Sequence, residues 1–389
     1  MSRPALYALG DLVEPVKTWS PERDCAEDSF VYIDLTAVDQ EAKAISGARG
    51  VRCAEAPSRA RQLVATGDVL VSTVRPNLNA VARVPSELDG ATASTGFCVL
   101  RGRPNKLDGA YLLHWVRSPR FVSEMVRRAT GASYPAVSDR IILESSLSLP
   151  PLTEQRRIAE VLDRAEALRT QRRAALAQLG TLTQSIFLNM FGDPIANTRQ
   201  WPTTSLGDLG TLDRGVSKHR PRNAPALLGG PYPLVQTGDV ANSDGYIRQF
   251  TSSYSELGLR QSRMWPAGTL CITIAATIAK TGVLTFSACF PDSVVGFSSD
   301  EPSNVEYVRA WLSFLQASLE AIAPESAQKN INLEILRKLD VPIPPIDQRR
   351  VFARRIEAVE ALKASYRTAL SAHDALFASL QDRAFRGAL

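Results

Sequence analysis

Two stretches of this sequence repeat one another almost two hundred residues apart. Residues 150–158 read PPLTEQRRI, and residues 344–351 read PPIDQRRV. A period near 194 residues is far longer than the roughly 20 to 50 residues of solenoid repeats. It therefore predicts two large homologous halves, for which a chain of 389 residues has ample length.

The similarity between the halves continues beyond this motif. At an offset of 194, residues 172–186 align with residues 366–380, and Phe191 aligns with Phe385. To align the two Gln-Arg-Arg triplets as well, one residue has to be deleted beside Asp347 and another inserted soon after.

Each copy of the motif opens a predicted long helix. The paired prolines cannot continue a helix backwards, so they mark its start, and Gly192 and Pro194 end the first helix. The residues that follow recur with alternating spacings of three and four, which predicts a coiled-coil seam. The seam positions are Ile158, Val161, Ala165, Leu168, Arg172, Ala175, Leu179, Leu182, Ile186 and Asn189 in the first copy, and Phe352, Arg355, Val359, Leu362, Tyr366, Ala369, His373, Leu376, Leu380 and Arg383 in the second.

About 36 residues at 1.5 Å each give a helix of roughly 55 Å, which needs a packing partner to be stable. Because a whole domain lies between the two helices, the second can return antiparallel to the first. We therefore predict that the helices pair as an antiparallel coiled coil related by a pseudo-twofold axis.

Charge is distributed unevenly along these helices. Residues 174–192 carry no charge, and residues 368–381 carry only Asp374. In an antiparallel pair these segments fall at opposite tips, where they would expose apolar surface. Such patches usually mark binding surfaces, so the sequence predicts docking of two copies of one partner through Phe187, Phe191, Phe377 and Phe385.

A globular region of about 150 residues precedes each helix. Strand-like runs at 67–78 and 94–101 have counterparts at 266–277 and 293–300. Helical patterns follow at 110–129 and 305–322, and then come polar loops at 130–139 and 324–334. The predicted fold class is α+β, with a first domain at 1–150, a central helix at 151–193, a second domain at 194–345 and a C-terminal helix at 346–389.

Motifs for catalysis are missing from the sequence. It contains no Walker A loop, no dinucleotide-binding glycine pattern and no nucleophile elbow, and its three histidines are too dispersed for a metal site. The net charge of +5 and pI of about 9.0 are compatible with nucleic acid binding. These features favour a binding protein over an enzyme, with no metal or cofactor of its own.

The cysteines and the N-terminus bear on the cellular compartment. Five scattered cysteines form no CxxC or zinc-type spacing, and no segment reads as a signal peptide or a membrane span. We therefore expect reduced thiols, a cytoplasmic location and no membrane partner.

The residues resemble a known family, the specificity subunits of bacterial type I restriction–modification systems. The resemblance spans essentially the whole chain and is strongest at residues 150–193, 67–101 and 328–350. It implies two target-recognition domains that each bind one half of a bipartite double-stranded DNA target. It also implies helices that set the spacer and dock two methyltransferase (modification) subunits, with a translocating restriction subunit as a further partner.

In this family S-adenosylmethionine and ATP are expected only on the partner subunits, whose DNA methylation and cleavage defend the cell against foreign DNA. On this reading, loop side chains bind phosphates and base edges. The candidate DNA-binding residues are Arg75, Asn77, Asn79, Arg101, Arg103 and Lys106 in the first domain, and Lys218, His219, Arg220, Arg222, Asn223, Lys329 and Asn330 in the second. Two alternatives stay open: a specificity scaffold of a related, type II-like restriction system, and a coiled-coil interaction protein with no DNA role.

Overall fold

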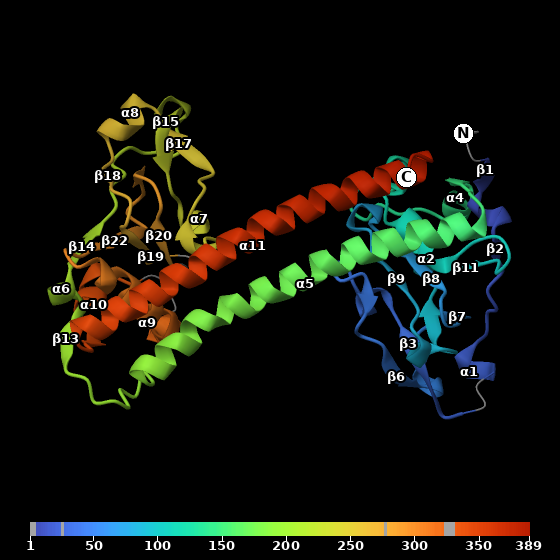
Figure 1. Ribbon diagram of the computed structural model, residues 1–389, viewed down its shortest axis with the longest axis horizontal. Helices are drawn as coiled ribbons and strands as arrows, with labels where there is room; N and C mark the ends of the chain where they lie inside the picture. The colour runs from blue at the N-terminus through green and yellow to red at the C-terminus, as the bar shows by residue number, and fades with distance from the viewer. Residues whose placement is uncertain (1–4, 25–26, 276–277, 323–330) are drawn as a thin grey trace. The chain divides into compact units, whose positions relative to one another are not determined.

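The computed structural model describes residues 5–24, 27–275, 278–322 and 331–389 (Figure 1). The chain forms two compact units, one made of Met1–Arg173 with Thr368–Leu389 and the other of Ala174–Arg367. Each unit contains one β-rich domain and parts of both long helices, α5 (Leu152–Phe191) and α11 (Ile346–Arg386). The domains predicted above are continuous segments of the sequence, whereas these units are defined by contacts and combine separate segments. The predicted domain limits therefore stay a prediction.

The first unit is built on a sheet of order β2-β11-β8-β9 and a second sheet of order β6-β3-β10-β7. At its centre Phe97 of β11 lies opposite Ser72 of β8, and Leu100 lies opposite Val69, in antiparallel pairing. Every position of β8 is buried, which accounts for its continuous apolar run. The strands and helices are β1 (Leu6–Ala8), β2 (Val13–Glu14), α1 (Pro21–Asp24), β3 (Ser29–Ile33), β4 (Val38–Asp39), β5 (Ala44–Ile45), β6 (Arg49–Arg52), β7 (Ala60–Leu63), β8 (Val69–Ser72), β9 (Val81–Arg83), β10 (Thr92–Ser94), β11 (Phe97–Gly102), α2 (Gly109–Val116), α3 (Pro119–Arg128), α4 (Asp139–Leu143) and β12 (Ser146–Ser148).

The helix expected over 110–129 is broken into α2 and α3. Pro119 cannot continue α2, and the Ser118 hydroxyl caps α3 by accepting a hydrogen bond from the Phe121 amide at 3.3 Å.

The second unit repeats this plan with a sheet of order β14-β22-β19-β20-β16 and a smaller sheet of order β17-β15-β21-β18. Leu270 of β19 lies opposite Phe297 of β22, and Thr273 lies opposite Val294. The equivalence predicted between runs 67–78 and 266–277, and between 94–101 and 293–300, is therefore confirmed for the central strand pair. The elements are β13 (Thr203–Ser205), α6 (Leu206–Leu209), β14 (Thr211–Arg214), β15 (Leu228–Leu234), α7 (Thr237–Ala241), β16 (Gly245–Ile247), β17 (Ser252–Tyr254), α8 (Glu256–Arg260), β18 (Met264–Trp265), β19 (Leu270–Thr273), β20 (Thr281–Leu284), β21 (Ala288–Cys289), β22 (Val294–Ser298), α9 (Pro302–Ile322), α10 (Leu333–Arg337) and β23 (Asp340–Pro342).

The starts of the two long helices are equivalent without any gap. Gln155 is buried, and its amide nitrogen donates to the carbonyl oxygen of Pro150 at 2.9 Å. Arg349 is buried in the same way, and its Nε donates to the carbonyl oxygen of Pro344 at 3.1 Å. Both pairs keep the offset of 194, so the deletion placed beside Asp347 was wrong. The sequence alignment matched Gln155 with Gln348 because the two residues are identical. In the structure Arg349 occupies the position equivalent to Gln155, so that alignment was shifted by one residue.

The four phenylalanines predicted to form exposed docking tips are buried, so that prediction of exposure was wrong. Phe187 and Phe191 pack with Phe352 in the core of the second unit, and Phe377 and Phe385 belong to the core of the first. The rings of Phe191 and Tyr307 lie 5.2 Å apart, and those of Phe385 and Tyr111 lie 5.3 Å apart. The charge-free helix ends are therefore apolar because a β-rich domain packs on them.

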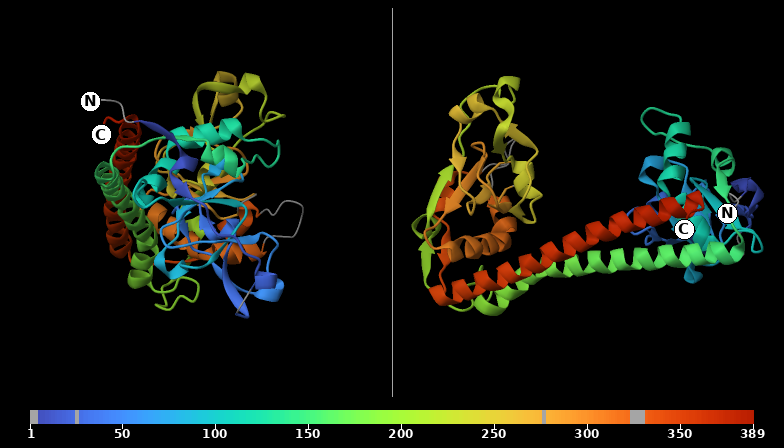
Figure 2. Two further views of the ribbon diagram at one scale, coloured as in Figure 1. Left: turned by 90° about the vertical axis from the view of Figure 1, so that its right-hand side faces the viewer. Right: turned by 45° about the horizontal axis from the view of Figure 1, so that its top comes forward.

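Each domain consequently contacts the beginning of one long helix and the end of the other. In the first unit the start of α5 and the end of α11 share one core, and in the second the start of α11 and the end of α5 do so (Figures 1 and 2). Arg169 Nε lies 2.6 Å from Asp374 Oδ1, which joins the two helices in the first unit. The contact of two long helices and the α+β class are as predicted.

The seam predicted on these helices is only partly correct. Ile158, Ala165, Phe352 and Val359 are buried as expected. The intervening positions are displaced by one residue, which leaves Leu168, Leu182, Leu362 and Leu376 between 36% and 49% exposed. Each helix has to face both a helix and a domain, so its buried stripe differs from a pure coiled-coil seam.

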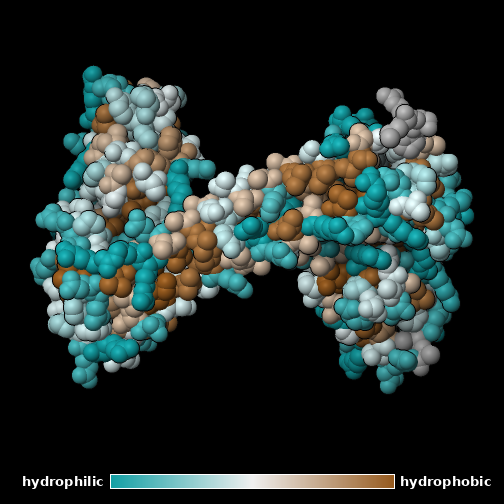
Figure 3. Space-filling view, in the orientation of Figure 1, coloured by the Kyte–Doolittle hydropathy of each residue, from teal (hydrophilic) through white to brown (hydrophobic). Residues whose placement is uncertain are grey.

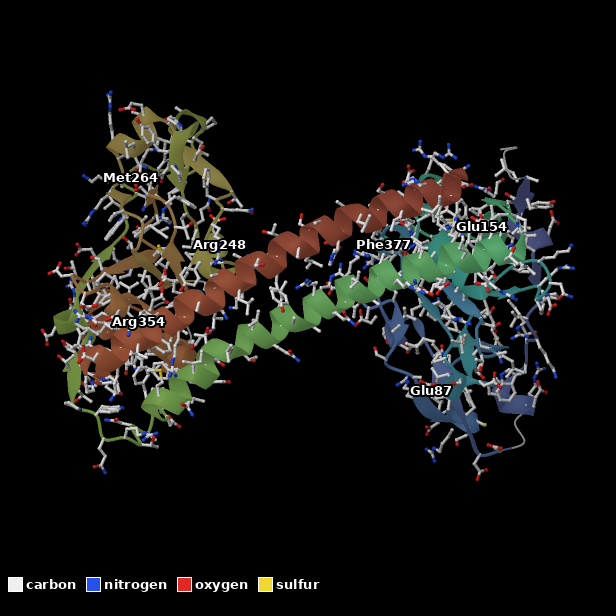
Figure 4. All side chains as sticks on the ribbon, in the orientation of Figure 1. Glu87, Glu154, Arg248, Met264, Arg354 and Phe377 are labelled. Carbon is white, nitrogen blue, oxygen red and sulfur yellow. The ribbon has the colours of Figure 1, made fainter. Side chains whose placement is uncertain are left out.

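Equivalent carboxylates also tie each helix to the domain in its unit. Glu166 of α5 lies 3.3 Å from an Arg117 nitrogen in the first unit, and Glu360 of α11 lies 2.7 Å from an Arg248 nitrogen in the second. Arg248 reaches from the segment after β16 toward α11 (Figure 4). The offset between the two carboxylates is again 194.

Three cysteines, Cys98, Cys271 and Cys289, are free and buried. Cys53 is disulfide-bonded, so the prediction of reduced thiols is wrong at that position. Among the residues that the structure describes, no helix combines the length and apolar character needed to cross a bilayer.

Replacing Phe385 by alanine should lower the free energy of unfolding by about 3–5 kcal/mol, because it opens a cavity beside Tyr111 and Trp115. The matched control on the same helix is Leu376→Ala, whose side chain is half exposed and should cost less than about 0.5 kcal/mol. Urea unfolding of both variants checks this, and equal losses would contradict the packing described.

Candidate nucleic-acid interface

In the first domain, two connections meet at the end of the central sheet where β8 finishes. The segment 73–80 follows β8, and the segment 130–138 lies beside it. The Arg75 amide donates to the Pro135 carbonyl at 2.7 Å, and the Val137 amide donates to the Thr73 carbonyl at 2.9 Å. Arg75 and Asn77 are exposed here. This end of the sheet therefore offers a basic and an amide side chain on a framework fixed by backbone hydrogen bonds.

Asn79 is held by hydrogen bonds within the first domain. Its side-chain nitrogen donates to the Val116 carbonyl at 2.8 Å, and its own carbonyl accepts from Lys43 Nζ at 2.5 Å. Burial and the nearby Arg117 guanidinium lower the pKa of Lys43 to about 8. Asn79 thus anchors the connection to α2, and its predicted contact with DNA stays a prediction.

The remaining predicted residues of the first domain lie at the opposite end of the same sheet. The guanidinium of Arg101 makes two bonds, of 2.9 and 2.7 Å, to the carboxylate of Asp68, which is almost fully buried. This pairing raises the pKa of Arg101 further above its usual range. Arg103 is exposed but donates to the Val13 carbonyl at 3.2 Å, and Lys106 is exposed beside the start of α5. The structure therefore splits the six residues into two separate groups.

In the second domain five predicted residues share one exposed loop between β14 and β15, which comprises Lys218, His219, Arg220, Arg222 and Asn223. The side-chain oxygen of Gln261 accepts hydrogen bonds from the amides of Lys218 and His219 at 2.6 and 3.0 Å. Arg220 and Arg222 both approach the carboxylate of Asp292, at 3.5 and 2.5 Å. Two guanidinium groups against one carboxylate leave the loop positively charged.

This loop belongs to the end of the sheet where β14 and β19 finish and β22 begins. Arg214 lies opposite Val295, and the Ile274 amide donates to the Ser293 carbonyl at 3.0 Å. The Ile331 amide in turn donates to the Ile274 carbonyl at 3.0 Å. Lys329 and Asn330 directly precede Ile331 but lie outside the described residues.

The same pair of connections therefore meets in both domains. The bond from Ile331 to Ile274 in the second domain corresponds to the bond from Val137 to Thr73 in the first. Segment 130–138 was expected only as a polar loop, and none of its residues was chosen as a contact. Its position beside Arg75 depends on a long-range pairing that local sequence does not reveal. Across the described ranges, no three His, Cys, Asp or Glu side chains are grouped as metal ligands would be.

Together these features define a class of proteins in which repeated β-rich domains are packed on paired long helices. A family model described as the type I restriction modification DNA specificity domain matches residues 65–178 and 198–370. The EcoBI specificity subunit of Escherichia coli is 22% identical over 327 residues, which cover 75% of this chain and 68% of that protein.

Solved structures are similar as well. A chain from work on complex assembly and conformational transition of the type I R-M system has a TM-score of 0.66 and 25% identity, and the match covers 100% of both chains. The type I S subunit from M. genitalium has a TM-score of 0.58 and 13% identity, and the match covers 98% of this chain and 96% of that one.

The chain belongs to the family of DNA-specificity subunits of type I restriction–modification systems. Such subunits are non-catalytic parts of a larger complex, and the cofactors sit on their partners, as the resemblance implied.

Replacing Arg101 by alanine should lower the free energy of unfolding by about 3 kcal/mol, because Asp68 would keep a buried charge without its partner. The exposed Lys106 serves as the control, since Lys106→Ala should leave stability within about 0.5 kcal/mol. Chemical denaturation of the two variants measures the difference. An Arg101→Ala protein as stable as the wild type would show that the ion pair is dispensable.

Proposed function

We propose that each domain reads one half of a bipartite DNA target, and that α5 and α11 set the spacing and dock two modification subunits. The observation that carries this proposal is the repetition of one polar pair of connections at the same end of the sheet in both domains. Two related but chemically different loop sets suit two different short sequences.

The loop chemistry supports contact with double-stranded DNA. Arginine and lysine side chains neutralise phosphates, which makes affinity fall with salt, and arginine and asparagine can read guanine and adenine in the major groove. The favoured contacts are Arg75 and Asn77 in the first domain and the loop from Lys218 to Asn223 in the second. Arg101 and Asn79 are better explained as structural residues.

The length of the helices supports a spacing role. Helices of 40 and 41 residues extend for about 60 Å. Half-sites one turn of DNA apart are separated by about 34 Å. A pair of such helices is therefore long enough to fix the interval between two half-sites.

Exposed leucines replace the buried phenylalanines as the candidate docking surface. In the first unit Leu168 is 46% and Leu376 is 49% exposed, and in the second Leu182 is 36% and Leu362 is 44% exposed. Each leucine of α5 has its counterpart on α11 at an offset of 194. Figure 3 shows hydrophobic residues at the surface of both helices. Two related patches suit two copies of a modification subunit.

The partners would supply the chemistry. The modification subunits would carry S-adenosylmethionine and methylate the DNA, and a restriction subunit with ATP would complete the defence against foreign DNA. Such a complex would act in the cytoplasm. A type II-like scaffold would instead have a different enzyme encoded beside it, and an interaction protein without a DNA role would show no salt-sensitive DNA binding.

Exchanging residues 201–340 for the same region of a relative should change one half of the methylated sequence and leave the other half intact. The reason is that this region contains most of one reading domain and little of the helices. Methylome mapping of cells that express the exchanged protein measures both halves. Changes in both halves would count against independent reading.

Replacing Leu168 and Leu376 together by glutamate should reduce the number of modification subunits in the complex from two to one, because charge is placed on one patch only. The control is Glu160→Gln, a change on the exposed Arg164–Glu160 pair of α5. Mass measurement of the purified complexes gives the stoichiometry. Two bound subunits in the double variant would rule out this patch.

A further inference from the structure

Tyr134 is the most exposed of the large hydrophobic side chains described, with 69% of its surface accessible. It lies in segment 130–138, beside the connection that follows β8. The ring therefore presents a large, amphipathic surface that a partner could contact. The other exposed large apolar side chain of these two described connections is Leu78, at 39%.

The backbone holds this ring in a defined position. Thr130 and Ala136 exchange two hydrogen bonds of 2.9 Å, which close the turn that carries Tyr134. Gly131 has φ +102°, and a Cβ there would lie 2.9 Å from the Tyr134 carbonyl oxygen. The turn therefore requires glycine and has little freedom to fold the ring away.

Arg75 completes the arrangement from the other connection. Its guanidinium lies 4.8 Å from the centre of the Tyr134 ring. Arg75 itself has φ 49°, an uncommon conformation for a residue with a side chain. The bond from its amide to the Pro135 carbonyl, of 2.7 Å, maintains that conformation. Such strain is concentrated at functional sites.

A rigid ring with a stacked guanidinium suits the edge of a base in a DNA groove, where apolar contact and hydrogen bonding occur side by side. Tyrosine offers a large contact area with few rotatable bonds. The guanidinium can reach a guanine edge or a phosphate while it covers one face of the ring. The nearby exposed Asn77 adds an amide that suits adenine.

We propose that Tyr134, with Arg75 stacked on its ring, contacts a base of the half-target read by the first domain and contributes to its specificity. This inference rests on the proposed function, since it names one of the residues that would do the reading. The tyrosine ring makes an apolar contact with a base edge in the groove, such as the methyl group of thymine, and the arginine fixes the ring and holds the DNA.

The test compares Tyr134→Ala with Tyr7→Ala in the complex with modification subunits. Tyr7 is an exposed tyrosine of the same domain, on β1, and serves as the matched control. The probes are a duplex with the target found by methylome mapping and an unrelated duplex of equal length. We expect Tyr134→Ala to lower affinity for the target about tenfold and affinity for the unrelated duplex less than about twofold. Tyr7→Ala should change neither, and both variants should melt like the wild type.

If the wild type prefers its target duplex and Tyr134→Ala binds that duplex equally well, this inference is overturned while the proposed function stands. Equal losses on both duplexes would also overturn the inference, because they would make the residue a sequence-independent contact. A wild-type complex without target preference would overturn the inference together with the proposed function. Tyr134→Phe should retain wild-type affinity, because the ring and not its hydroxyl makes the contact with the base edge.

Discussion

In each unit, a phenylalanine at the end of one long helix packs against a tyrosine of the β-rich domain, and this contact joins the helix end to the core of that domain. Phe191 meets Tyr307, and Phe385 meets Tyr111, at nearly the same ring separation. Phe191 lies on α5 but contacts the second domain, and Phe385 lies on α11 but contacts the first domain. The core of each domain therefore includes residues from both long helices. The two units are therefore built on the same plan although they belong to one polypeptide.

This exchange of helix ends has consequences for recognition. The loops that carry Arg75, or Lys218 to Asn223, are positioned by sheets whose cores include those helix ends. The ion pairs of Glu166 and Glu360 add a polar connection at equivalent points. The two domains therefore carry different loops on cores that are built in the same way.

The sequence was sufficient for the repeat, the central strand pairs and the two long helices, because these depend on local pattern and on similarity within the chain. It was insufficient for the environment of Phe187, Phe191, Phe377 and Phe385, since an apolar helix end looks the same whether a partner or the chain's own domain covers it. The predicted coiled-coil seam was partly right for a similar reason. Leu168 and Leu376 fit a heptad pattern, but they are exposed because packing against the domains buries the neighbouring positions of the helices instead.

The candidate interface shows the same limit. Polar loops could be found from composition, but Arg101 pairs with a buried aspartate at one end of the sheet while Arg75 lies at the other. Tyr134 was not predicted as a contact, because it lies about sixty residues from Arg75 in the sequence. The two residues are brought together by long-range hydrogen bonds such as the one from the Arg75 amide to the Pro135 carbonyl. Long-range strand and loop contacts decide which polar residues can act together.

The account is tested most directly by mapping DNA methylation in the host with and without this gene. It predicts that deletion removes methylation at one bipartite motif, whose two specified parts are separated by a fixed number of unspecified bases. Loss of methylation at one continuous motif, or no loss at all, would contradict the reading of two half-sites by two domains.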